Sequence, residues 1–383
     1  MVTLNQLRIN QLRKQYLLAE EPLTFKEVIK NQLGLHSTDY WTPYFSIYAR
    51  IGDYNPKDLF QALNRGDEIF RINCFRLAVF VVHVENLAMI LKSTGKSLYN
   101  YYRKAPPLRV LNEEEIEEVI EKIRISLKEK PKRIHDLKKE IPELASNKRF
   151  IFRLAMAKGE VVRASTINAK STLTSYDLLQ KRSSNINLEK ITENEARQQL
   201  IYKYIERFGP VSENDISWWL PLSRKGTKEI INNLSEQITS HEVNSTQYWL
   251  EREDYEIADS LDEPQEEIIT FLPYEDHFPK AFLDRWYIDQ ELKQRLFPRF
   301  YKSYWPEKPL KIINTGPNTS GEIRPSIWLN NNIIGRWELD KKDKEYKIVM
   351  DIYRKLENSQ ISLIEEKKRN LEKFINKKLV PIS

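Results

Sequence analysis

Residues 55–82, NPKDLFQALNRGDEIFRINCFRLAVFVV, combine one helical segment with two strand segments. Asn55 followed by Pro56 is a cap with an early proline, which predicts a helix that begins there. The apolar residues of this helix recur at helical spacing: Leu59, Phe60 and Leu63. The β-rich runs Ile69–Ile72 and Leu77–Val82 then predict a pair of strands.

The residues before this stretch add further short helices to the pattern. Thr24 and Glu27 have the spacing of a capping box, and Pro43 suits the first turn of another helix. Several short helices closed by a strand pair are typical of a winged helix-turn-helix. Residues 1–108 are therefore predicted to form a first unit of this kind.

The same pattern recurs in residues 109–190. A first helix is predicted from one apolar stripe: Ile116, Val119, Ile120 and Ile123. A short helix over Arg133–Glu140 follows, and Ser146 is positioned to cap a third helix that ends at Gly159. Val161 then begins a strand, which completes a second predicted unit.

A third unit is predicted over residues 191–255. Ser212 and Ser223 are positioned to cap two helices, and Gln247–Leu250 indicates a wing strand. The recurrence lies in the order of helices and strands and not in residue identity.

Residues 256–383 depart from this pattern and predict a β-rich domain with terminal helices. Ile268–Leu272 indicates a strand, and Asn330–Asn332 is a turn signal between two apolar runs. The charged, amphipathic stretch 345–379 predicts one or two helices, whereas the acidic stretch Glu251–Glu267 predicts a solvated linker. The predicted fold class is α+β, with three tandem winged helix-turn-helix units before the C-terminal domain.

The composition excludes several classes of protein. The 383 residues include 61 Lys and Arg against 55 Asp and Glu, and the net charge of +6 is compatible with nucleic acid binding. Cys74 is the single cysteine, and the five histidines lack metal-ligand spacing, so we expect no metal or other cofactor. There is no apolar run of the ~18–20 residues that span a bilayer, and no secretory signal at the N-terminus. We therefore expect a cytoplasmic protein that does not bind membranes.

Basic residues gather on the predicted third helix of the second unit, Ser146–Lys158. Lys148, Arg149 and Arg153 lie on this helix, and Arg163 lies on the following strand. In a winged helix these positions would face DNA. The alternative is that they form the solvated face of a basic protein. Arg224, Lys225 and Lys228 hold a similar place in the third unit.

Several stretches, in the same order, resemble the signatures of a bacterial and archaeal winged-helix DNA-binding family that contains the AlkZ- and YcaQ-like DNA glycosylases. The matching stretches are Leu33–Asp39 with Pro43–Arg50, Tyr204–Ser212 with Asp215 and Trp218, Phe271–Asp276, Asp284-Arg285 and Gly321–Trp337. The resemblance implies three tandem winged helices, a C-terminal barrel-like domain, and excision of alkylated bases, including bulky adducts and crosslinks, from double-stranded DNA.

The family's Gln-x-Gln or Gln-x-Asp motif falls on His36 and Thr38, which is a departure from the pattern. An alkylated purine is cationic and leaves readily, so the enzyme mainly has to place a water molecule and stabilise positive charge on the sugar. In an extended turn, residues i and i+2 point the same way. His36 and Thr38 are therefore predicted to hold the water together, with Asp39 stabilising charge. The alternative is that His36 and Thr38 only cap the preceding helix and bind backbone.

The first wing is a second departure. Where the family pattern has Gly, Thr and His, this chain has Leu77, Ala78 and Phe80, although Arg76 is kept. The resemblance places Arg50 and Arg76 near the DNA phosphates of the predicted pocket. His83 is predicted to start a helix and not to replace the missing histidine.

Three functions are compatible with these patterns. The first is a monomeric, monofunctional, nucleoid-associated DNA glycosylase acting on alkylated purines. The second is a non-catalytic DNA-binding protein, a regulator or damage sensor, that has lost the glutamines. The third is a scaffold whose winged helices bind protein, which the modest net charge of +6 leaves open.

Overall fold

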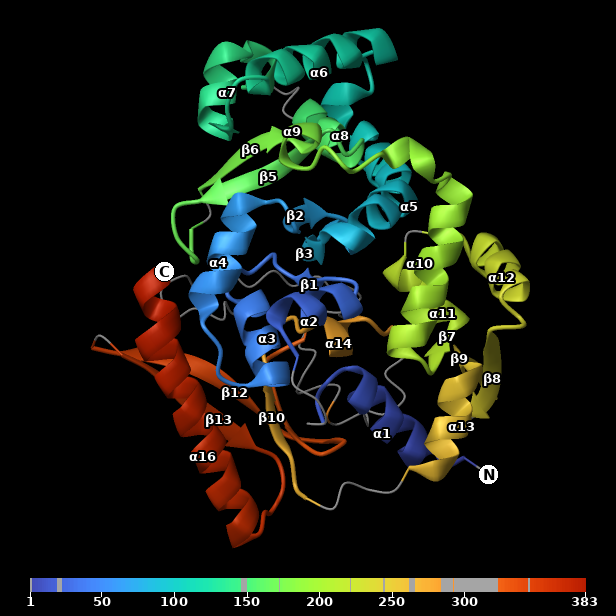
Figure 1. Ribbon diagram of the computed structural model, residues 1–383, viewed down its shortest axis with the longest axis vertical. Coiled ribbons are helices and arrows are strands. Elements are labelled where there is room, and N and C mark those ends of the chain that lie inside the picture. Colours follow the sequence, from blue (N-terminus) through green and yellow to red (C-terminus); the bar gives the residue numbers. More distant parts are fainter. Residues whose placement is uncertain are drawn as a thin grey trace. The chain divides into compact units, whose positions relative to one another are not determined.

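The computed structural model (Figure 1) describes residues 2–18, 23–145, 150–171, 173–220, 222–243, 245–261, 266–283, 292, 323–343 and 345–383. The fold is α+β, as predicted, with helices and open antiparallel sheets. The chain forms two compact units, neither of which is continuous in sequence. Unit 1 comprises Met1–Val28, Trp41–Lys57 and Tyr204–Ser383, and unit 2 comprises Ile29–Tyr40 and Asp58–Lys203. The predicted domain boundaries stay predictions.

The helices begin where the sequence supplies caps. The α-helices of the described residues are α1 (Leu4–Lys14), α2 (Phe25–Asn31), α3 (Thr42–Ile51), α4 (Pro56–Arg65), α5 (Val84–Arg103), α6 (Glu113–Leu127), α7 (Ile134–Glu140), α8 (Ile151–Ala157), α9 (Leu179–Arg182), α10 (Glu193–Phe208), α11 (Glu213–Trp219), α12 (Arg224–Asn233), α13 (Arg252–Ser260), α14 (His277–Lys280) and α16 (Asn358–Phe374). The predicted capping box is confirmed before α2, since the Thr24 and Glu27 side chains bond each other's backbone N–H groups. Ser212 and Ser223 cap α11 and α12, as expected.

One strand arrangement occurs three times along the chain. Each time a two-residue strand precedes two helices and a strand pair, and it then pairs with the last strand of that pair. The strands are β1 (Leu35–His36), β2 (Ile69–Asn73) and β3 (Val79–His83); β4 (Lys132–Arg133), β5 (Val161–Thr166) and β6 (Thr174–Leu178); and β7 (Val211–Ser212), β8 (Ile238–Val243) and β9 (Thr246–Glu251). The sheet orders are therefore β1-β3-β2, β4-β6-β5 and β7-β9-β8, which confirms the predicted recurrence.

Unit 2 contains the first two strand groups joined into one sheet. β2 pairs with β5 in an antiparallel manner, so the sheet order is β1-β3-β2-β5-β6-β4. The predicted stripe of α6 is buried in a core shared with α5 and α8, and consists of Ile116, Val119, Ile120 and Ile123. The Asn112 side chain caps α6 by accepting a hydrogen bond from the Glu115 N–H. The cap and the buried apolar stripe therefore place the same helix.

Unit 1 contains the third strand group and a four-stranded antiparallel sheet. This sheet has the order β10 (Ile269–Leu272), β11 (Ser326–Leu329), β12 (Asn332–Lys342) and β13 (Glu345–Ile352), and α16 packs on β10 and β13 (Figure 1). The predicted hairpin is confirmed, and its turn residue Asn330 has a φ of 49°. Within the described residues the sheet has two open ends and does not close, which corrects the barrel-like expectation.

Two further predictions in this unit are wrong. Residues 345–352 form β13 and not a helix, because their side chains alternate between the two faces while β12 supplies a partner strand. The predicted linker contains α13, whose Asp254 is buried and forms an ion pair with Lys14 of α1. Burial of a carboxylate against a lysine stabilises a helix that its composition alone would leave solvated.

Candidate active site

The family motif spans the end of β1 and the loop that follows it in unit 2, and this segment is held close to β3. Leu35 and His36 pair with Val81 and Phe80. Gly34 has a φ of 103°, and a Cβ atom there would lie 2.8 Å from the Val81 oxygen. Glycine is therefore required for the chain to approach β3 this closely before entering the loop.

His36 lies inside the fold. The residue is only 2% exposed, and its ring packs edge-on against Phe80 with the ring centroids 5.4 Å apart. Phe80 in turn packs edge-on against Phe75 at 5.1 Å. The two departures from the family pattern thus meet at one cross-strand pair, because His36 stands where the family has Gln and Phe80 where it has His.

Thr38 is exposed, and its hydroxyl is used by the sheet. Its Oγ1 accepts a hydrogen bond from the Val79 N–H at 3.2 Å, while the Ser37 N–H donates to the Val79 carbonyl at 2.7 Å. The Thr38 hydroxyl therefore takes the place of a backbone carbonyl as the acceptor for the Val79 N–H, just beyond the last residue of β1. The predicted pair differs in environment: His36 is buried and Thr38 faces solvent, followed by the half-buried Asp39.

Arg71 of β2 contacts this loop and holds it in place, a role that the sequence analysis did not predict. Its Nε donates to Ser37 Oγ at 2.9 Å, and its guanidinium lies 3.9 Å from the centre of the Tyr40 ring. Arg71 is 7% exposed, so a buried cation fixes the residues on both sides of Thr38 and Asp39. The available signal was an arginine inside the apolar run Ile69–Ile72.

Arg163 of β5 lies directly opposite Arg71 where β2 and β5 pair. Opposite residues of an antiparallel pair share one face of the sheet, so two cations lie side by side there. Arg163 donates to Asn73 Oδ1 at 2.8 Å, and it has no carboxylate partner among the described residues. This junction between the first two strand groups is a local concentration of positive charge.

The first wing keeps its shape without the family's glycine. Arg76 and Leu77 have φ angles of 51° and 63°, in the left-handed region where glycine is favoured. Arg76 is half-buried in the turn between β2 and β3. His83 caps α5 by accepting from the Glu85 N–H, which confirms the expected helix start.

Arg50, in unit 1, has a structural role in place of the predicted phosphate contact. Its guanidinium forms two hydrogen bonds of 2.9 Å to the Asp276 carboxylate, and both side chains are fully buried. Ser46 donates to the same carboxylate at 2.7 Å. Burial alone would raise the pKa of Asp276, but the charges of Arg50 and His277, together with the hydrogen bonds from Arg50 and Ser46, outweigh it and lower the pKa to about 2. Two motifs of the resemblance, around Arg50 and Asp276, therefore meet in one buried ion pair.

The predicted basic helix is described only in part. Lys148 and Arg149 lie outside the described residues, whereas Arg153 is exposed on α8 with its guanidinium 5.3 Å from the Tyr102 ring centre. Lys158 forms an ion pair with Glu117 of α6. Arg153 therefore keeps the position expected of a DNA contact, while Lys158 is bound to a carboxylate.

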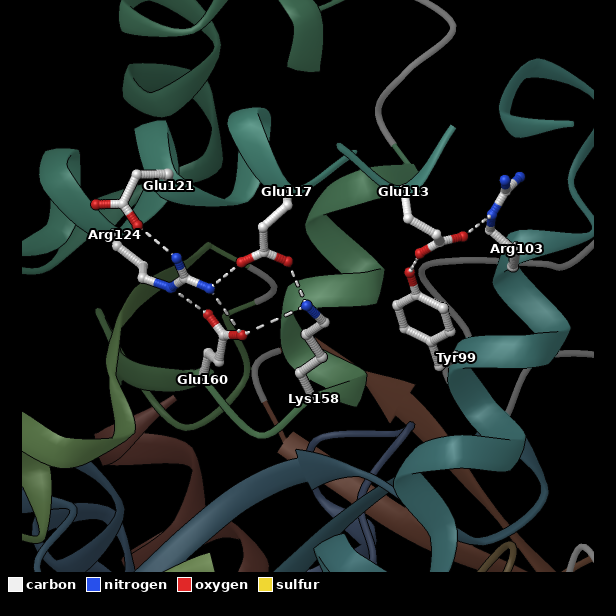
Figure 2. A network of polar contacts seen from close by, with 8 residues as sticks. All are labelled: Tyr99, Arg103, Glu113, Glu117, Glu121, Arg124, Lys158 and Glu160. Atoms are coloured by element: carbon white, nitrogen blue, oxygen red, sulfur yellow. Dashed lines mark hydrogen bonds and ion pairs between the residues drawn. The ribbon is translucent and has the colours of Figure 1, made fainter. Parts of the chain in front are cut away.

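Figure 2 shows that Lys158 belongs to a larger network along α6. Arg124 binds Glu117, Glu121 and Glu160, and Arg103 binds Glu113, which also accepts from Tyr99. Hydrogen bonds from Arg103 and Tyr99 lower the pKa of Glu113. This network ties α6 to α5, α8 and β5 and so fixes the core beneath Arg153.

The comparisons agree with this architecture. A family model described as DNA glycosylase AlkZ-like matches residues 29–374, so the chain belongs to the AlkZ-like DNA glycosylase family. Among solved structures, the Streptomyces sahachiroi DNA glycosylase AlkZ is similar, with a TM-score of 0.75 and 12% identity over 97% of this chain and 96% of that one. At this identity the likeness concerns the fold. No curated protein matches in sequence.

None of the helices in the described part of the chain is long and apolar enough to cross a membrane.

Proposed function

We propose that this protein is a monofunctional DNA glycosylase that removes alkylated purines from double-stranded DNA. The observation that carries the proposal is the family match over residues 29–374. The three strand–helix–helix–hairpin groups would act as winged helices, and the loop after β1 would provide the chemistry.

Within that loop, Thr38 and Asp39 are the residues we assign to the reaction. Thr38 is exposed and Asp39 is half-buried, so both are accessible to a nucleotide turned out of the duplex. The Thr38 hydroxyl would orient a water molecule, and the Asp39 carboxylate would accept its proton. The contacts from Arg71 to Ser37 and Tyr40 hold the loop still, which is the condition for placing a water molecule accurately.

The proposed step is a hydrolysis of the N-glycosidic bond. The water oxygen bonds to C1′ of the deoxyribose as the bond from C1′ to the purine nitrogen breaks. The bonding electrons return to the cationic base, which leaves neutral, and the proton of the water passes to Asp39. The carboxylate also stabilises the positive charge that develops on the sugar. His36, packed on Phe80 beneath the loop, would act as a positioning residue.

Duplex binding would rely on one exposed and two half-buried cations of unit 2. We assign this role to Arg153 on α8 and to Arg163 at the β2–β5 junction, with Arg76 in the first wing. Lys148 and Arg149 are proposed to extend this surface. Each phosphate contact that is lost should reduce the salt dependence of binding by about one unit of slope.

The test is to incubate the full-length protein with duplex DNA that carries an N7- or N3-alkyl purine and to measure abasic sites by alkaline cleavage. Wild-type protein should produce abasic sites in the alkylated duplex and not in the unmodified duplex. Thr38→Val should slow excision by about tenfold, because the hydroxyl that orients the water is lost. Absence of abasic sites with every alkylated duplex would refute the enzymatic proposal.

A second candidate function is favoured by one observation at the same loop. His36 is buried on Phe80, and the Thr38 hydroxyl already bonds the Val79 backbone, so the motif has a packing role. A non-catalytic DNA-binding protein would show salt-dependent duplex binding without excision. The binding and abasic-site measurements on the same samples distinguish the two functions.

A further inference from the structure

A large basic cavity lies wholly within unit 1, apart from the loop after β1. It has a volume of about 1100 Å³ and is lined by residues of α1, α3, β10 and α16, elements labelled in Figure 1. Among the described residues, eight lysine and arginine side chains line it against a single carboxylate, Asp53. Three of these eight cations pair with carboxylates, Lys14 with Asp254, Arg50 with Asp276 and Lys378 with Asp53, so the positive charge that a ligand would meet comes mainly from the other lysines of α16 and the turn after it.

Several of these cations have no acidic partner. Lys367 and Lys373 lie on α16 and Lys377 on the π-helical turn Ile375–Leu379; all three line the cavity and are exposed. Among the described residues they form no ion pair, whereas Lys378 pairs with Asp53 at 2.8 Å. A lysine in the last turn of a helix can stabilise the helix dipole. Lys367 lies about two turns before the end of α16, so the dipole does not account for its position.

A fourth cation, Arg207 of α10, contributes to the wall of the cavity. Its guanidinium donates to the Lys14 carbonyl at 2.6 Å and lies 5.2 Å from the Tyr16 ring centre. Its Nε is buried without a hydrogen-bond partner among the described residues. The Arg207 Nε–H could therefore donate a hydrogen bond to an acceptor atom of a bound ligand.

The floor of the cavity is apolar and partly aromatic. Tyr48 of α3 and Phe374 of α16 both line it, and their ring centroids are 4.7 Å apart. The buried residues Leu17, Ile269 and Leu371 also contribute to its lining. A ligand that matches both parts combines more than one negative charge with a flat, apolar group.

We propose that this cavity binds a nucleotide, with its phosphate against Lys367, Lys373 and Lys377 and its base against the half-buried Tyr48, whose ring packs on the buried Phe374. The nucleotide is either a free nucleoside phosphate or part of a single DNA strand, since both present the same chemistry. Lysine–phosphate contacts and stacking of bases on aromatic rings are the two ways in which proteins bind unpaired nucleotides. This site is separate from the proposed glycosylase chemistry and does not depend on it.

The experiment measures fluorescence anisotropy of fluorescein-labelled (dT)8 with the full-length protein at several salt concentrations. The triple variant Lys367→Gln, Lys373→Gln, Lys377→Gln should weaken binding at least tenfold and reduce the salt slope by about two. A charge-matched control, Lys57→Gln, Lys342→Gln, Lys355→Gln, removes three exposed lysines of unit 1 that do not line the cavity and should change the affinity less than twofold. Tyr48→Leu should weaken binding several-fold with an unchanged salt slope.

Competition identifies the source of the ligand. Displacement of the probe by dTMP or dTTP would support a free nucleotide, and displacement only by unlabelled oligonucleotides would support a DNA strand. Equal affinity of the two triple variants, or no binding of (dT)8, dTMP or dTTP, would overturn the proposal. Since the probe contains no lesion and no duplex, such a failure leaves the abasic-site result unaffected.

Discussion

The buried pair Arg50–Asp276 in unit 1 and the network along α6 in unit 2 use the same chemical groups in opposite environments. Arg50 and Asp276 are fully buried and joined by two hydrogen bonds, whereas Glu117 and Arg124 retain 42% and 33% of their side-chain exposure. Solvent screens the second network and not the first. We therefore expect the buried pair to determine whether unit 1 folds, and the α6 network to adjust the stability of unit 2 only slightly.

The largest effect is expected when the buried pair is broken. Arg50→Met leaves the Asp276 carboxylate buried without its cation and should lower the free energy of unfolding by about 3–5 kcal/mol. Chemical denaturation monitored by tryptophan fluorescence measures this loss. The double variant Arg50→Met, Asp276→Leu should recover part of it, because no unpaired charge is left. If Arg50→Met lowered the free energy of unfolding by less than about 1 kcal/mol, the buried pair would be no more stabilising than the exposed network of α6.

The buried region should also respond to acid. Burial, aided by the charge of Arg50, lowers the pKa of His277 to about 3. An unfolded histidine has a pKa near ~6.5, so below this pH the unfolded state gains a proton that the folded state does not accept until about pH 3. The free energy of unfolding should therefore have its full value above pH 6.5. It should fall as the pH decreases below 6.5, by up to about 1.4 kcal/mol per pH unit. Asp276 should extend the fall from pH ~4 toward pH ~2.

Urea denaturation at pH 7, 5.5 and 4.5 measures this slope. His277→Gln should reduce the slope between pH 6.5 and 4.5 whatever its effect at pH 7. An unchanged slope in the variant would show that other groups cause the acid sensitivity. Glu113 of the α6 network should contribute little here, since hydrogen bonds from Arg103 and Tyr99 lower its pKa.

Arg71 is an intermediate case, because it is buried but bonds a hydroxyl and stacks on a ring. Arg71→Gln removes the contacts to Ser37 and Tyr40 and should slow excision by about tenfold through loss of loop order. As a positioning residue it should change the excision rate more than duplex affinity. Arg163→Gln is the matched control, and it should instead weaken duplex binding and reduce its salt slope. The reverse pattern would make Arg71 a phosphate contact.

The smallest effect is expected on α6. Glu117→Gln removes the charge that Lys158 and Arg124 share, and should lower the free energy of unfolding by about 0.5 kcal/mol. High salt should abolish this difference, as measured by denaturation with and without 1 M NaCl. Glu118→Gln changes an exposed glutamate of α6 outside the network and should have no effect. A loss as large as that of Arg50→Met would contradict the comparison.

The sequence predicted those parts of the fold that depend on neighbouring residues. The caps at Ser212 and Ser223, the turn at Asn330 and the apolar stripe of α6 are local signals, and all are confirmed. The helix α13 was missed because Asp254 finds its partner in Lys14, 240 residues away. Long-range pairing of this kind leaves no pattern in a single sequence.

The candidate site shows the same division. The loop predicted between Gly34 and Pro43 contains Thr38, whereas His36 belongs to the strand β1, which the sequence analysis did not predict. The burial of His36 depends on Phe80, the loop order on Arg71 and the role of Arg50 on Asp276, and none of these partners is near in sequence. Of the predicted contacts, Arg50 is corrected, whereas His36, Thr38 and Asp39 stay predictions.

The central claim is that the exposed part of this loop performs base excision. Single-turnover formation of abasic sites in an alkylated duplex tests it directly when Asp39→Asn is compared with Asp136→Asn, an exposed aspartate of α7 in the same unit. We predict a loss of about 10²-fold or more for Asp39→Asn, with duplex affinity unchanged, and wild-type rates for Asp136→Asn. Equal excision rates for the two variants would contradict the assignment of the reaction to this loop.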